Sequence, residues 1–223
     1  PLLNMARDCV GRGRPGLTGD QRRFLAGLGL ALALLVPSST LVTGDAGVWG
    51  AWASKLQTHV STPISNNMGL RVVASYSPGA RSARLMSLGK PDILGSWRAA
   101  RQQVFNARRP WFLLLVGFYC LLLGRAVRGR EPWRAAILSV GLFPVAAAST
   151  CYYYSLLLVY GLAASRWRKV AAGLNLYASA GWLVVWLIPI LDEHYTWLSA
   201  LSLLYVVGVT AWAAINREAE AAP

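Results

Sequence analysis

The chain has 223 residues, of which 55% are hydrophobic and only 14% charged, and its formal net charge is +13. This composition indicates lipid rather than water as the solvent around much of the chain. The basic residues lie mainly between apolar runs, where anionic lipid headgroups are the nearest partners, and no basic-aromatic array accompanies them. The charge therefore does not indicate nucleic acid. We predict an all-α fold, a polytopic helical bundle embedded in a membrane.

The cysteines and the first residue bear on what this chain is part of. Cys9, Cys120 and Cys151 are scattered and form neither a disulfide framework nor a metal-ligand spacing. The chain begins with Pro1 and shows no signal peptide at its start. We therefore expect a fragment or a trimmed product, and the portion that preceded Pro1 can hold the chemistry.

The amino-terminal third divides into an arm, a span and a long loop. Residues 1–23 form a basic arm punctuated by Gly and Pro, which argues against a packed unit. Residues 24–42 are apolar throughout and predict a transmembrane helix. Residues 43–110 then form the largest segment outside the membrane.

Two stretches of that loop have the periodicity of amphipathic helices lying on the membrane surface. In residues 44–60, Trp49, Trp52, Leu56 and Val60 recur at intervals of three or four. In residues 91–109, Asp92 can cap a helix whose apolar face holds Ile93, Leu94, Trp97, Val104 and Phe105 and whose basic side holds Arg98, Arg101 and Arg108.

The remaining chain alternates apolar runs with short polar links. The predicted spans are 111–124, 170–191 and 195–215, with a polar tail at 216–223. Between them, residues 135–164 form an uncharged run that as one helix would be about 45 Å long, whereas a bilayer core is about 30 Å thick. The run is too long to cross once without extending beyond the core, and its small, polar centre at 146–150 favours a broken helix or a hairpin.

The distribution of positive charge favours the hairpin. If residues 135–164 return to the side they leave, every short basic segment falls on one side, and the acidic turn at 192–194 falls on the other. The positive-inside rule then places both termini in the cytoplasm of a bacterial cell, with the chain crossing the inner membrane several times. A single crossing, the alternative, would put the basic residues 166–169 outside and the acidic turn inside.

On the hairpin topology, polar side chains of several segments gather at the outer face. The predicted polar cluster comprises His59, Asn66, Asn67, Tyr152, Tyr153, Tyr154, Asp192, Glu193 and His194. Buried tyrosine hydroxyls need partners, so the three consecutive tyrosines indicate either a polar cavity or an aromatic belt at the interface. A solvated turn is the plainer interpretation of Asp192 and Glu193, and a general base or metal ligand is the functional one.

Three arginines of the long loop are candidates for binding a lipid phosphate. Arg71, Arg81 and Arg84 lie near the predicted interface, and a guanidinium can bind two phosphate oxygens at once. Ordinary attraction to headgroups explains them equally well. No cofactor or metal site is predicted, although a divalent cation stays an open alternative if the chain is an enzyme.

Two stretches resemble a known group of proteins. His59 to Arg71, with its TPISNNMGLR sequence, and Leu142 to Ser155, LFPVAAASTCYYYS, resemble the carboxy-terminal half of uncharacterised polytopic membrane proteins of bacteria. Those proteins are similar in layout to the C-superfamily of glycosyltransferases, which use polyprenyl-phosphate sugars at the outer membrane face. The catalytic acid of that superfamily lies in a first outer loop that has no counterpart here, so the resemblance assigns no catalytic residue to this chain.

Three functional hypotheses follow. The first is the membrane portion of a lipid-linked sugar transferase, whose partners would be membrane lipids, among them polyprenyl phosphate. The second is a noncatalytic structural or assembly subunit, which would dock against other membrane-protein chains. The third is a transporter, but its usual intramembrane acidic residues are lacking in the predicted spans.

Overall fold

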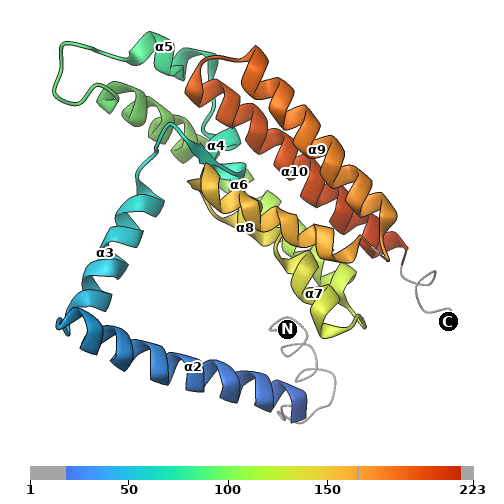
Figure 1. Cartoon of the computed structure of the whole chain (residues 1–223). Helices are drawn as coiled ribbons and strands as arrows, with labels where there is room; N and C mark the ends of the chain where they lie inside the picture. Colours follow the sequence, from blue (N-terminus) through green and yellow to red (C-terminus); the bar gives the residue numbers. More distant parts are fainter. Residues whose placement is uncertain (1–18, 165, 217–223) are drawn as a thin grey trace. The chain divides into compact units, whose positions relative to one another are not determined.

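The computed structural model describes residues 19–164 and 166–216, and 78% of them are helical (Figure 1). The chain divides into two compact units, Pro1–Ser61 and Thr62–Pro223. Among the described residues, four helical stretches are long and apolar enough to cross a membrane: Arg22–Thr43, Gly95–Val127, Arg168–Leu187 and Asp192–Ile215. The prediction of an all-α membrane bundle is confirmed.

The first unit is a helical pair, α2 (Gly19–Thr43) and α3 (Val48–Ser61). Pro37 lies inside α2 and lacks an N–H, and nearby hydroxyls bond back to the helix, as where Ser38 Oγ donates to the Leu34 carbonyl at 2.7 Å. Gly44 turns the chain with φ 65°, and Trp49 Nε1 donates to Ser39 Oγ at 3.0 Å. The predicted amphipathic helix at 44–60 thus corresponds to α3.

The second unit is built around two long parallel helices, α6 (Gly95–Val127) and α10 (Leu191–Ile215). Arg101 pairs with Asp192 and Tyr119 Oη pairs with Thr210 Oγ1, and both pairs have the same offset in sequence. Eighteen residues separate the two contacts on each helix, so the helices stay in register for about 27 Å. Helix α9 (Arg168–Leu187) packs antiparallel to α10, beside which it lies in Figure 1.

The uncharged run folds as a hairpin. Its first arm is α7 (Pro132–Ser139) with α8 (Leu142–Ala146), its tip is β2 (Ser149–Thr150), and its second arm is the 3-10 helix η2 (Cys151–Ala163). Tyr160 Oη donates to the Leu138 carbonyl at 3.3 Å, which shows that the two arms lie side by side. Gly141 makes this approach possible, because an added Cβ would lie 2.8 Å from Tyr160 Oη and 2.0 Å from Tyr119 Oη.

The 3-10 form of η2 makes the second arm of the hairpin longer than an α-helix of the same number of residues would be. At about 2.0 Å per residue its thirteen residues extend about 26 Å, against about 20 Å for an α-helix of the same length. Its buried side chains, Tyr154, Leu157, Tyr160 and Ala163, recur every three residues, so a helix with three residues per turn places all four on one face.

The long loop differs from its prediction. The expected surface helix at 91–109 and the expected span at 111–124 form a single helix, α6, in which Pro110 is an interior residue. Proline disfavours helix in the residue before it but does not forbid it, and no Gly follows to end the helix there. Residues 62–94 form short elements instead: β1 (Asn67–Met68), α4 (Leu70–Ala74), η1 (Pro78–Ala80) and α5 (Ser82–Leu85).

The two ends of the second unit differ in character. At one end, which we call the capped end, residues 62–94 meet the hairpin tip 147–150 and the first turn of α10. At the other, the basic end, the links 125–134 and 166–169 meet the last turn of α10, where Arg130 Nη2 donates to the Ala213 carbonyl at 2.7 Å. Helices α6, η2 and α10 run from the capped end to the basic end, and α7, α8 and α9 run back.

Candidate functional site

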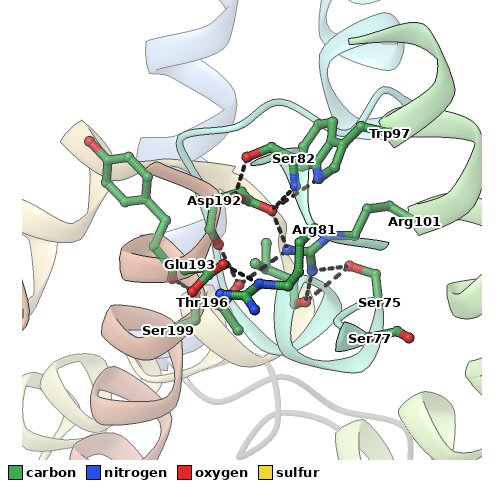
Figure 2. Close-up of polar contacts among 12 residues, drawn as sticks. Ser75, Ser77, Arg81, Ser82, Trp97, Arg101, Asp192, Glu193, Thr196 and Ser199 are labelled. Atoms are coloured by element: carbon green, nitrogen blue, oxygen red, sulfur yellow. Dashed lines mark hydrogen bonds and ion pairs between the residues drawn. The ribbon is translucent and has the colours of Figure 1, made fainter. Parts of the chain in front are cut away.

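A buried ion pair fixes the loop to the bundle at the capped end (Figure 2). Arg101 Nη2 lies 3.3 Å from Asp192 Oδ2, and the two side chains are only 2% and 1% exposed. The Asp192 carboxylate also accepts hydrogen bonds from the backbone N–H and the hydroxyl of Ser82 and from Trp97 Nε1. One carboxylate therefore joins α5, α6 and α10.

Arg101 is enclosed by further contacts from the loop. Its Nη1 donates to the Val72 carbonyl at 3.2 Å, and its guanidinium lies over the ring of Tyr76 at 5.1 Å. It also lies 3.4 Å from Ser75 Oγ and from Thr196 Oγ1. Two charges so far removed from water stabilise a fold only when most of their polar atoms are bonded, as most are here. This pair is a structural anchor.

Two predictions about these residues are wrong. Arg101 does not lie on a basic surface, and Asp192 is not in a solvated turn but in the first turn of α10. The sequence does carry a signal that Arg101 is buried, since Trp97, Arg101 and Phe105 are spaced four residues apart and therefore share a helix face. An arginine that is buried with the apolar face of its helix needs a buried carboxylate to offset its loss of hydration, and Asp192 is one of the few acids in the chain.

The loop and the hairpin tip pair directly at the capped end through Asn66 and Asn67. Strand β1 pairs antiparallel with β2, with Asn67 opposite Thr150, and the Cys151 N–H donates to the Asn66 carbonyl at 3.0 Å. Asn66 Nδ2 donates to Tyr152 Oη at 3.3 Å. The Asn66 side-chain oxygen is buried and has no hydrogen-bond partner among the described residues.

Gly69 closes the same junction. Its φ is 119°, and an added Cβ would lie 2.5 Å from the Ala147 carbonyl oxygen and 2.9 Å from that of Pro144. Its N–H donates to Ser199 Oγ at 2.9 Å. Only glycine fits a position that combines this φ with such a close approach. The asparagine pair and the glycine thus form a junction between the loop, the hairpin tip and α10.

The three consecutive tyrosines face different surroundings. Tyr152 and Tyr153 are 71% and 57% exposed, whereas Tyr154 is buried and packs against Phe143 with ring centroids 5.8 Å apart. The Tyr154 hydroxyl has no partner among the described residues. His194 is buried, with Nδ1 3.2 Å from the Ile188 carbonyl oxygen, and its ring contacts Tyr195. The side chain of His59 lies outside the described residues.

The three arginines proposed for phosphate binding contact different elements. Arg71 Nη2 donates to Gln102 Oε1 at 3.1 Å, its guanidinium lies over the Phe105 ring, and its partial burial lowers the pKa of this group. Arg81 forms an ion pair with Glu193. Arg84 is exposed on α5. Arg71 is thus engaged at α6 and Arg81 at α10.

The described residues offer no ready cation site, because no group of three or more His, Cys, Asp or Glu gathers in residues 19–164 and 166–216. Comparison with known proteins yields no matching family model, curated protein or solved structure. This chain is an integral membrane protein, since four of its described helices have the length and apolarity of membrane spans.

Proposed function

We propose that this chain is the membrane portion of a glycosyltransferase that uses a polyprenyl-phosphate-linked sugar at the outer face of the bacterial inner membrane. One observation carries the proposal. The two stretches that resemble such proteins, residues 59–71 and 142–155, lie far apart in the sequence but meet at the capped end through the β1–β2 pair. If the two stretches form one site, a common function explains why both resemble the same group of proteins.

The chemistry at this junction suits a sugar headgroup. The Asn66 side-chain oxygen has no partner among the described residues, and once the junction opens to admit a sugar it can accept a hydrogen bond from a hydroxyl group. Tyr152, whose hydroxyl accepts a hydrogen bond from Asn66, and its neighbour in sequence Tyr153 both have exposed rings, and aromatic faces pack well against the C–H faces of sugars. Arg84, exposed on α5 in the same loop, is available to a phosphate.

The catalytic acid or base is not assigned to a residue of this chain. Asp192 accepts four contacts from Ser82, Trp97 and Arg101, and Glu193 pairs with Arg81, so both carboxylates have structural roles. In this proposal the capped end holds the donor lipid.

Binding of a sugar-linked lipid tests the proposal directly. The purified chain is titrated with undecaprenyl phosphate carrying glucose, and with undecaprenyl phosphate alone, and the complexes are counted by native mass spectrometry. We expect a preference for the sugar-linked lipid that falls about fivefold in Asn66→Ala, the effect of one net hydrogen bond. Asn175→Ala, which removes an exposed amide of α9, is the matched control. Equal binding of both lipids by the unaltered chain would exclude the proposal.

A noncatalytic assembly subunit is the second candidate, and the use of both carboxylates in ion pairs favours it. On this alternative the capped end is a rigid platform for another membrane chain. Purification in a mild detergent would then recover a defined partner chain in fixed ratio, and neither undecaprenyl lipid would bind in preference to phosphatidylcholine.

A further inference from the structure

An apolar groove runs between α9 and α10 in the half of the bundle nearer the basic end. It has a volume of about 530 Å³, within the range of about 300 to 1,000 Å³ that is usual for ligand sites. Its walls include Leu176 and Leu204, which are 71% and 72% exposed, so the groove opens sideways. In a membrane-spanning bundle, that opening faces lipid.

Glycines and tyrosines shape the groove. At Gly173 an added Cβ would lie 3.2 Å from the Tyr205 ring, so the two helices touch there and form its floor. At Gly208 an added Cβ would meet nothing within 4 Å, which leaves space above α10. Beyond the groove, Gly181 again brings α9 close to α10, with Leu198 3.3 Å from its added Cβ. This contact closes the deep end.

The length of the groove matches one leaflet of a bilayer. Its lining runs from Lys169 to Ala180 on α9 and from Leu201 to Trp212 on α10. Eleven residues of helix extend about 16 Å, roughly half of a hydrocarbon core of about 30 Å. A docked transmembrane helix would need a surface that continues through the other leaflet, whereas an acyl chain needs only this length.

The charge at the mouth of the groove selects the headgroup. Lys169 lines the mouth at the basic end, and Arg166 and Arg168 are exposed close by. Basic residues where a groove between membrane helices opens at the headgroup level attract anionic lipid. We propose that the groove between α9 and α10 binds an anionic glycerophospholipid of the leaflet at the basic end, with an acyl chain along Gly173 and Gly208 and the phosphate at Lys169.

The test uses the full chain, purified in detergent and delipidated, with native mass spectrometry as the readout. The probes are dioleoylphosphatidylglycerol and dioleoylphosphatidylcholine, which share their acyl chains and differ in headgroup charge. We expect one phosphatidylglycerol to bind about fivefold more tightly than phosphatidylcholine, the usual effect of one basic residue at an anionic lipid. Lys169→Gln should abolish this preference, and Arg128→Gln, an exposed arginine of the same end that does not line the groove, should keep it.

A second pair of variants tests the acyl-chain site. Gly208→Leu should fill the groove and remove the tight site for both lipids, whereas Gly117→Leu, which also meets open space on α6, should leave it intact. Unchanged binding by Gly208→Leu would overturn the proposal. The proposal would also be overturned if the native mass corresponded to two protein chains and Gly208→Leu reduced it to one, because a second copy would then occupy the groove. Displacement of phosphatidylglycerol from the groove by undecaprenyl phosphate would overturn it as well. If Gly208→Leu does not fold, loss of the headgroup preference in Lys169→Gln decides the matter.

Discussion

The buried Arg101–Asp192 pair makes a sharp prediction about stability. Replacing Asp192 by Asn keeps the size of the side chain but removes its charge. The Arg101 guanidinium, which is only 2% exposed, then loses the carboxylate that it pairs with. Removing one partner of a buried ion pair costs about 3 to 5 kcal/mol, because the other charge stays buried without compensation. That is a large part of the 5 to 15 kcal/mol that typically separates folded from unfolded protein, about half of it in many cases.

The free energy of unfolding can be measured by titrating SDS into mixed micelles and following tryptophan fluorescence, since Trp97 donates to the same carboxylate. Glu193→Gln is the matched control one residue away, because its partner Arg81 is 35% exposed and a pair with one solvated member contributes less than a fully buried one. Ser82→Ala removes a hydroxyl that donates to a buried carboxylate and should cost about 1.5 to 3 kcal/mol. Equal losses in Asp192→Asn and Glu193→Gln would refute the role of burial in this argument.

Two glycines give further predictions. Gly69→Ala combines an unfavourable φ with a Cβ 2.5 Å from the Ala147 carbonyl oxygen, so we expect a loss of at least about 2 kcal/mol in the same SDS titration, and a wild-type midpoint would contradict the close approach. Gly141→Ala forces Tyr119 away from its place and should cost about 1 to 3 kcal/mol, whereas Gly117→Ala, which meets open space, should be neutral or stabilising; the reverse order of midpoints would contradict the hairpin packing.

The coarse architecture follows from the sequence because it depends on composition, run length and charge distribution. The uncharged run at 135–164 is too long for one span, and the structure folds it into two arms whose side-by-side packing is shown by the Tyr160–Leu138 contact. The helix type of the second arm was not predicted. Its signal is the spacing of Tyr154, Leu157 and Tyr160, which is three residues rather than the mixture of three and four that an α-helix needs.

The errors concern residues whose surroundings come from distant parts of the chain. The local sequence predicts a helix boundary at Arg108, Arg109 and Pro110. Helix α6 nevertheless continues through them, because it packs against α4 and α10. Asp192 reads as part of a hydrophilic turn until Ser82, Trp97 and Arg101 are brought to it from about a hundred residues away. Local pattern predicts elements, whereas a buried polar network depends on which elements meet.

The orientation of the second unit, with the capped end outside the cell, is the claim on which the proposed function depends. It is tested by labelling intact cells with a membrane-impermeant maleimide, after the natural cysteines are replaced by alanine and a single cysteine is introduced at an exposed position. Pro189→Cys, in the turn before α10, should be modified from outside, and Arg168→Cys, at the start of α9, should react only after the cells are permeabilised. Modification of Arg168→Cys but not Pro189→Cys in intact cells would contradict the predicted orientation and place the capped end in the cytoplasm.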